Sequence, residues 1–100
     1  MKILDINDNF LALEEENSNF ENSKIAIVSA PYEHTVSYGG GTKYGPEAII
    51  KASQFVEFYD EEFDRELCFE QGICTIGPID FDGKANKEAL DMIYDQVKEL

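Results

Sequence analysis

The chain has 100 residues, so it forms at most one small domain with one modest core. Hydrophobic residues make up 43% and aromatic residues 12%, which is typical of a globular protein and excludes an intrinsically disordered one. A formal net charge of -13 opposes binding to nucleic acid, and no apolar run approaches the ~18 residues of a membrane span. We therefore expect a soluble, cytoplasmic protein with no nucleic-acid and no membrane partner.

Residues 1–23 are predicted to form an N-terminal arm that lies over a larger body. This segment is acidic, and its stretch at residues 14–19 is typical of a solvated turn, for which we expect no catalytic role. Scattered apolar residues would anchor the arm: Ile3, Leu4, Ile6, Phe10, Leu11, Leu13 and Phe20.

The first predicted strand is Lys24–Ala30, which reads Lys-Ile-Ala-Ile-Val-Ser-Ala. A continuous apolar and β-branched run without alternation indicates a strand that is covered on both faces, as in a parallel sheet. Pro31 ends this strand, because proline cannot donate a hydrogen bond to the ladder. A long, glycine-containing loop follows at Tyr32–Gly45.

The first predicted helix opens at Gly45-Pro46-Glu47. Proline in the first turn loses no hydrogen bond, and the carboxylate of Glu47 favours the positive end of the helix. Apolar residues at helical spacing predict a stripe that faces a core: Ala48, Ile49, Ala52, Phe55, Val56 and Tyr59. An acidic connector follows at residues 58–66.

The second predicted strand is Ile73–Ile76, a short β-branched run between glycines, preceded by the apolar residues Leu67–Phe69. Cys68 and Cys74 lie near it, at a spacing that matches neither a Cys-x-x-Cys redox pair nor a zinc knuckle. We therefore expect two reduced, partly buried thiols.

The clearest predicted helix runs from Asn86 to Leu100, with Asn86 or a neighbour as its N-cap. Glu88 in the first turn and Lys98 in the last complement the helix dipole. Its apolar stripe consists of Ala89, Leu90, Ile93, Tyr94, Val97 and Leu100.

The order arm, strand, loop, helix, strand, helix predicts the opening of an α/β domain with a parallel sheet. A strand that is covered on both faces needs more neighbours than two strands and two helices supply. The chain also ends inside its strongest helix. We therefore expect residues 24–100 to be the strand–loop–helix–strand–helix portion of a longer, truncated α/β domain.

The glycine-rich loop fails the patterns of phosphate-binding loops. Counted from Gly40, a Walker A motif would need Lys and Ser or Thr where Pro46 and Glu47 stand, and the dinucleotide pattern would need glycine at Tyr44. Glu47 would also repel a phosphate at the helix start. The loop is thus expected to use its glycines for unusual backbone angles.

His34 is the only histidine, so no histidine triad or multi-histidine metal site can be assembled from this chain. It follows the carboxyl end of the first strand, the edge at which α/β sheets bind ligands. Two roles stay open for His34: a structural or surface role in the loop, and a place at the mouth of a substrate site.

The segment from Ile25 to Ser53 resembles the N-terminal segment of the agmatinase and arginase family of ureohydrolases. In that family, a first strand ends in Pro-Tyr or Pro-Phe and an acid, and a glycine-containing loop runs into Gly-Pro and a helix. The chain departs from the pattern at Glu33, where Asp is common, and at Gly40, where Pro is common. The matching residues are Pro31, Tyr32, Gly41, Thr42, Gly45, Pro46, Ala48, Ile49, Ala52 and Ser53.

This resemblance implies a three-layer α/β/α, arginase-like enzyme that releases urea from a guanidino substrate, as in the conversion of agmatine to putrescine in polyamine biosynthesis. Two Mn ions in such an enzyme activate the attacking hydroxide. The family's metal-binding motifs, of the types Gly-Gly-(Asp/Glu)-His-Ser, Asp-Ala-His-x-Asp and Ser-x-Asp-x-Asp, do not occur in the sequence. We therefore expect no catalytic, cofactor-binding or metal residue in this chain, and no activity from the chain alone.

For this chain, the resemblance implies one wall of the substrate mouth, with His34, Tyr38 and Thr42 as candidates, and homo-oligomer formation. The alternative is a non-catalytic binding or oligomerisation module derived from the same fold.

Overall fold

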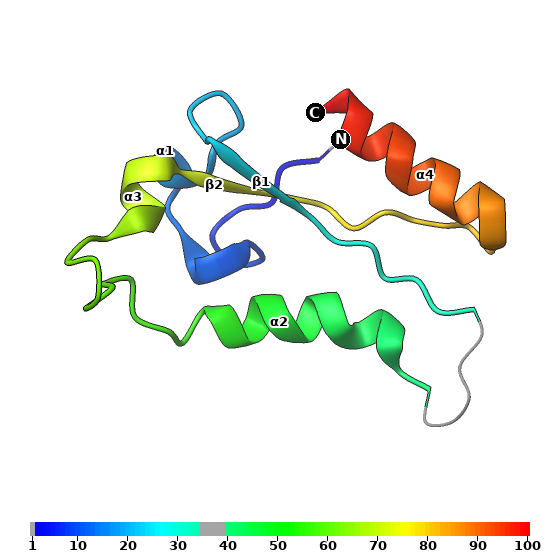
Figure 1. The fold of residues 1–100 in the computed structure, drawn as a ribbon, viewed down its shortest axis with the longest axis horizontal. Coiled ribbons are helices and arrows are strands. Elements are labelled where there is room, and N and C mark those ends of the chain that lie inside the picture. The colour runs from blue at the N-terminus through cyan, green and yellow to red at the C-terminus, as the bar shows by residue number, and fades with distance from the viewer. Residues whose placement is uncertain (1, 35–39) are drawn as a thin grey trace.

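The computed structural model describes residues 2–34 and 40–100 (Figure 1). Two parallel strands and two longer helices form its framework, and short helical turns connect them. In chain order the elements are η1 (Phe10–Ala12), α1 (Glu15–Ser18), β1 (Ile25–Val28), η2 (Thr42–Tyr44), α2 (Gly45–Ser53), α3 (Leu67–Gln71), β2 (Ile73–Ile76) and α4 (Asn86–Glu99).

β2 is paired along both of its edges, by β1 and by the N-terminal arm. It pairs in parallel with β1, in a register that sets Ile25 opposite Ile73. Its other edge binds the N-terminal arm in antiparallel fashion, since the Leu4 N–H donates to the Thr75 carbonyl at 2.8 Å. With both edges paired, all four residues of β2 are buried. The parallel α/β arrangement that the sequence predicts is thereby confirmed.

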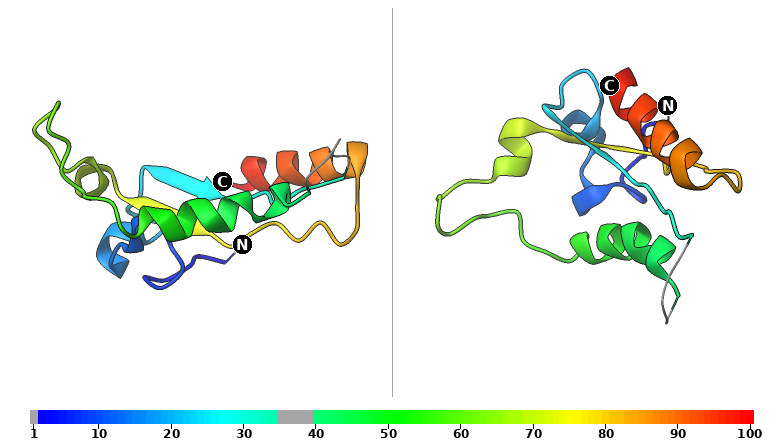
Figure 2. Two further views of the ribbon diagram at one scale, coloured as in Figure 1. Left: turned by 90° about the horizontal axis from the view of Figure 1, so that it is seen from below. Right: turned by 45° about the vertical axis from the view of Figure 1, so that its right-hand side comes forward.

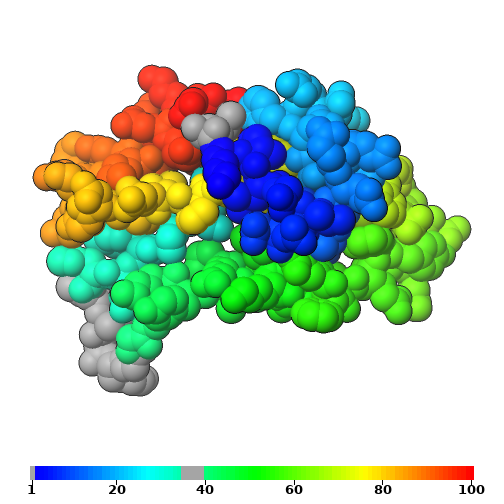
Figure 3. Space-filling view, turned by 180° about the vertical axis from the view of Figure 1, so that it is seen from behind, coloured from blue at the N-terminus to red at the C-terminus, as the bar shows by residue number. Residues whose placement is uncertain are grey.

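The sheet lies between helices. Figure 1 shows α4 on one side of the strands and α2 on the other, and the view from below in Figure 2 keeps β2 between β1 and the arm. Seen from behind, the arm covers the strands between the two helices (Figure 3). This layering agrees with the opening part of an α/β/α fold.

Buried polar groups fix the arm in place. The Asn9 side chain is fully buried, and it accepts the Leu13 N–H at 2.7 Å while its own amide donates to the Leu13 carbonyl at 2.8 Å. The Phe10 N–H donates to Thr75 Oγ1, and the Leu11 N–H donates to Ser53 Oγ, each at 2.8 Å. Because buried donors are costly to leave unpaired, these bonds define the path of the arm across β2 and α2.

The two cysteines are free, as expected, and both are buried where the sequence predicts partial burial. Cys68 forms part of a small apolar cluster with Leu13 and Ile73. Burial raises the pKa of both thiols, at Cys68 and at Cys74, so the neutral thiol is the favoured form.

The expectation that the first strand is covered on both faces is wrong for these residues. β1 leaves Ile25 43% exposed, and Ala26 is exposed as well. The reason is its position, because in the part of the chain that the structure describes β1 pairs only with β2. The strand that is buried throughout is β2.

The predicted stripe on the first helix is also wrong. α2 ends at Ser53, so Phe55, Val56 and Tyr59 lie beyond it, and the Phe55 side chain is 89% exposed. The helix turns Ser53 toward the arm instead, which leaves Ile49 63% exposed. The apolar residues before the second strand, Leu67–Phe69, belong to the short helix α3.

The predicted helix at the end of the chain is present, but only part of its stripe is covered. Ala89 is fully buried and Ile93 is half-buried. Of the two alternatives for the N-cap, Asn86 or a neighbour, the structure has the neighbour Ala85 at the capping position, without a side-chain hydrogen bond, and Asn86 has a φ of 56°. The other apolar residues of the stripe are exposed: Leu90 at 64%, Tyr94 at 63%, Val97 at 53% and Leu100 at 41%.

The molecule exposes more surface than its size requires. Its accessible surface is 7207 Å², whereas a folded monomer of this mass exposes about 5,700 Å². Its radius of gyration is 15.1 Å, compared with about 13 Å for a compact domain of this length.

We predict that Ile76→Ala destabilises the fold by about 2–5 kcal/mol, because Ile76 is 1% exposed and its loss leaves a cavity beside β1 and the arm. The matched control is Ile49→Ala on exposed α2, which should change the free energy of unfolding by no more than about 0.5 kcal/mol. Urea denaturation followed by circular dichroism measures both values. Equal effects of the two substitutions would contradict the burial pattern.

Candidate functional site

The carboxyl end of β1 leads into the loop that the sequence singles out. The Ser29 carbonyl accepts the Ile79 N–H at 3.0 Å, so the segments that follow β1 and β2 stay side by side beyond the strands. The Tyr32 N–H then donates to the Ala30 carbonyl at 2.8 Å, so the backbone makes a tight turn around Pro31. This turn directs Tyr32 and His34 out of the sheet at the edge where α/β proteins bind ligands.

Tyr32 links this edge to the start of α4. Its ring lies 5.2 Å from the ring of buried Phe81, and its hydroxyl oxygen accepts the Asn86 N–H at 2.9 Å. The His34 ring lies 6.5 Å from the Tyr32 ring in a stacked orientation. Tyr32 also supplies a partner for one of the otherwise unpaired N–H groups at the helix start.

Glu33 joins the two ends of the loop. Its carboxylate accepts the Gly41 N–H at 2.6 Å and the Lys43 N–H at 3.4 Å. These bonds, and chiefly the one from Gly41, lower the pKa of Glu33, because they stabilise its charged form. Gly41 adopts a φ of 121°, a conformation that favours glycine.

Two of the three predicted site residues lie next to the hydrogen bond that closes the loop. His34 follows Glu33 and Thr42 follows Gly41, and the Gly41 N–H donates to the Glu33 carboxylate. Both side chains are exposed. Tyr38, the third candidate, lies outside the described residues.

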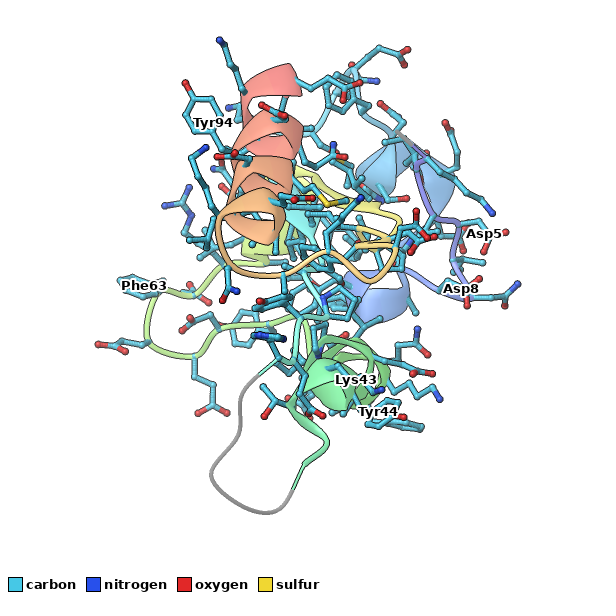
Figure 4. The ribbon with its side chains drawn as sticks, turned by 90° about the vertical axis from the view of Figure 1, so that its right-hand side faces the viewer. Asp5, Asp8, Lys43, Tyr44, Phe63 and Tyr94 are labelled. Atoms are coloured by element: carbon cyan, nitrogen blue, oxygen red, sulfur yellow. The ribbon has the colours of Figure 1, made fainter. Side chains whose placement is uncertain are left out.

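A pocket of about 350 Å³ opens beside this loop, on the α2 side. Its walls are mainly apolar and its rim is charged, which is the general character of a small-molecule site. Figure 4 shows Asp8 on the arm and Lys43 at the foot of α2. The lining residues are Leu4, Asn7, Asp8, Ser29, Pro31, Lys43, Pro46, Glu47, Ile50, Lys51, Gln54 and Pro78.

Sequence reasoning missed the pocket residues Asp8 and Lys43. In the sequence they are ordinary surface charges, one in the acidic arm and one in the loop, and no motif joins them. They line one pocket because the arm crosses β2 and lies against α2, which is a long-range contact with no local signal.

The described residues do not fit a manganese centre. Within residues 2–34 and 40–100, no group of three or more His, Cys, Asp or Glu side chains is placed to hold a metal ion. The manganese ligands that the resemblance implies are therefore not assigned to this part of the chain. In the same residues, no helix combines the length and the apolar character that crossing a membrane requires.

The comparisons with known proteins agree with the element order and with the loop. The model of the arginase family matches residues 23–100, which include both strands, the Glu33 loop and the helices α2, α3 and α4. The chain belongs to the arginase family. No solved structure matches the chain.

The chain is also similar to individual members of the family. The agmatinase of Bacillus cereus is 39% identical over 85 residues, which cover 81% of this chain and 28% of that protein. The agmatinase of Bacillus anthracis is 38% identical over the same length. The N(1)-aminopropylagmatine ureohydrolase of Synechocystis sp. is 39% identical over 62 residues, 62% of this chain and 20% of that protein. This chain thus spans between a fifth and a third of the length of these relatives.

We predict that Gly41→Ala costs about 1–3 kcal/mol, because alanine is strained at a φ of 121°. The nearest atom to an added Cβ there lies 3.9 Å away, so the cost arises from the backbone and not from a clash. Gly45→Ala is the matched control: Gly45 is helical with open space around it, so alanine should stabilise the fold by about 0.5–1 kcal/mol. Denaturant unfolding of both variants tests the loop geometry, and a stable Gly41→Ala variant would contradict it.

We predict that the Glu33 carboxyl titrates below its usual pKa, and that the Gly41 amide senses this titration. A pKa that is lower in the folded state adds stability above the unfolded-state pKa, and this stability is lost as the pH falls through the folded-state pKa. NMR spectra recorded between about pH 6 and pH 2 follow the Gly41 amide shift. In Glu33→Gln the same shift should be independent of this carboxyl; an unchanged titration in that variant would refute the bond.

Proposed function

We propose that the chain forms the N-terminal part of a manganese-dependent, agmatinase-like ureohydrolase that cleaves agmatine to putrescine and urea. The observation that carries this proposal is the family match over residues 23–100 together with relatives named agmatinase at 38–39% identity. The proposal includes a cytoplasmic location and assembly as a homo-oligomer.

The proposed substrate is agmatine or an N(1)-aminopropyl derivative of it. The names of the similar relatives divide between agmatinase and N(1)-aminopropylagmatine ureohydrolase. Both names describe a guanidino group on an aliphatic chain. A site for such a molecule would combine apolar walls with charged ends, which is the character of the pocket beside the loop.

Within that enzyme, this chain contributes scaffold and substrate mouth. The guanidinium carbon is a poor electrophile, and bound manganese ions would supply a hydroxide at neutral pH. The residues described here hold no donor set for those ions. What they supply is the strand end, the turn at Pro31 and the loop that Glu33 closes, with His34 and Thr42 exposed on it.

We predict that the chain alone, with Mn²⁺ added, releases urea from agmatine no faster than buffer with Mn²⁺. A chimera in which this chain replaces the matched segment of the Bacillus cereus agmatinase should release urea from agmatine. A colorimetric urea assay measures both rates, and the intact agmatinase is the positive control. Turnover by the chain alone would refute its proposed inactivity, and a folded but inactive chimera would count against an agmatinase-like role.

The same chimera tests the substrate mouth. If His34 and Thr42 contact the substrate, His34→Ala and Thr42→Ala should each raise KM for agmatine about fivefold, the equivalent of one hydrogen bond of ~1 kcal/mol, with little change in kcat. Lys87→Ala, an exposed residue on α4, is the control and should leave KM unchanged. Unchanged KM in both loop variants would favour the structural role for His34.

A further inference from the structure

The pocket between the arm and α2 carries two charges of opposite sign that have no ion-pair partner. Asp8 lines it from the arm and Lys43 lines it from η2 (Figure 4). Among the described residues, neither side chain forms an ion pair, and Glu33 bonds to the backbone N–H of Lys43 and not to its ammonium. The other two charged residues of the lining, Glu47 and Lys51, pair with each other at 2.9 Å. The pocket therefore presents one anion and one cation to a ligand.

A buried hydroxyl belongs to the same pocket. Ser29 lines it and is only 8% exposed, and its carbonyl accepts the Ile79 N–H. The other buried serines of the described residues, Ser18 and Ser53, donate their hydroxyls to backbone carbonyls, whereas that part of the chain supplies no hydrogen-bond partner for the Ser29 hydroxyl. Because buried polar side chains are normally hydrogen-bonded, this hydroxyl is a candidate contact for a bound molecule.

Hydrogen bonds between the arm and α2 hold the walls of the pocket in place. At the end of α2, the Gln54 side-chain amide donates to the carbonyls of Asn7 and Asn9, at 3.2 and 3.3 Å. The Leu11 N–H donates to Ser53 Oγ at 2.8 Å. The pocket is thus formed before any ligand binds, and its volume of about 350 Å³ falls within the range of small-molecule sites.

We propose that this pocket binds a zwitterionic amino carboxylate with an aliphatic chain. The ligand's carboxylate would pair with Lys43 and its ammonium with Asp8. Its chain would lie on the apolar wall, to which Leu4 and Ile50 contribute. The Ser29 hydroxyl can serve either end of the ligand, because a hydroxyl donates to a carboxylate and accepts from an ammonium.

The signs of the two charges separate this ligand from the proposed substrate. A guanidino amine also suits apolar walls with charged ends, but it carries a cation at each end. Its second cation would meet the like charge of Lys43, which is unfavourable. A zwitterion meets an opposite charge at both ends. Binding of such a ligand is independent of the proposed release of urea.

Titration of the full chain with 6-aminohexanoate, followed by NMR of the backbone amides, tests the site. The expected result is saturable 1:1 binding with a Kd of about 1 mM or tighter, the scale for a ligand of this size. The amides of Asp8, Ser29 and Lys43 should shift. Hexanoate and hexylamine each keep one of the two charges, and each should bind about fivefold more weakly.

Two substitutions should each remove one part of this preference. Lys43→Gln should abolish the advantage of 6-aminohexanoate over hexylamine, and Asp8→Asn should abolish its advantage over hexanoate. Lys98→Gln is the matched control and should leave all three affinities unchanged. The Lys98 ammonium lies 5.8 Å from the centre of the Tyr94 ring, much as that of Lys43 lies 5.4 Å from the Tyr44 ring, but on α4.

Ser29→Ala tests the buried hydroxyl separately from the two charges. The substitution removes a hydroxyl that has no partner in the described part of the chain, so the free energy of unfolding should stay the same or rise. Binding of 6-aminohexanoate should weaken about fivefold, the equivalent of one hydrogen bond. A loss of stability would instead indicate a structural partner and would count against a role for Ser29 in the pocket.

Three outcomes would overturn the proposal. One is the absence of saturable shifts in a folded chain at ligand concentrations well above the expected Kd. Another is equal binding of the zwitterion and of both singly charged compounds, or equal effects of Lys98→Gln and Lys43→Gln. The third is agmatine that binds at the same amides more tightly than 6-aminohexanoate, which would assign the pocket to the substrate. A chimera that fails to release urea would leave these measurements unaffected, so the two proposals fail separately.

Discussion

The fold depends on the pairing of both edges of β2. β1 binds one edge in parallel, and residues of the arm bind the other edge in antiparallel fashion. In a chain with so few strands, this double pairing is what buries four consecutive residues and satisfies their backbone groups. The arm is therefore part of the sheet, and its contacts with Thr75 and Ser53 tie the strands to α2. Without the arm, β1 and β2 would form a two-stranded sheet in which each strand has one unpaired edge, and such a sheet is marginally stable at best.

In the loop after β1, two side chains each make more than one contact. One carboxylate, that of Glu33, bonds to two backbone N–H groups on the far side of the loop. One ring, that of Tyr32, packs on Phe81 while its hydroxyl oxygen accepts a backbone N–H of α4. These two neighbouring residues set the positions of the loop and of the helix start relative to the sheet. Tyr32 and Glu33 thus hold the loop and the helix start in place through structural contacts, which require no catalytic role for either residue.

Sequence reasoning predicted the elements that carry a local signal. The β-branched runs of the two strands, Pro46 at a helix start and the helical spacing of Asn86–Glu99 each gave the right element. Sequence reasoning failed where the burial of a residue depends on whether another element packs against it. Ile49 and Tyr94 have the spacing of core residues and are exposed, because spacing shows which residues share a face and not whether another element covers it. The α2 stripe fails for a second reason, since its later members lie beyond Ser53.

In the candidate site, too, some residues could be predicted from the sequence and others could not. His34 and Thr42 are candidates that the resemblance implies, and in the structure their neighbours Glu33 and Gly41 are joined by a hydrogen bond across the loop. The pocket contacts of Asp8 and Lys43, and the bond from Asn86 to Tyr32, join residues that are far apart in the chain. No pattern within a short window contains such pairs. The resemblance to the arginase family supplied the class of protein, and the structure adds the contacts that Tyr32 and Glu33 make.

The bond between the Tyr32 hydroxyl and the Asn86 N–H changes how substitutions at position 32 should be interpreted. Relatives that carry phenylalanine after the proline would keep the ring on Phe81 and lose the acceptor at the helix start. In a mutational survey scored by activity, a loss at Tyr32 would resemble the loss of a substrate contact. Its origin would instead be a displaced helix, and the two causes separate only when the fold and the reaction are measured independently.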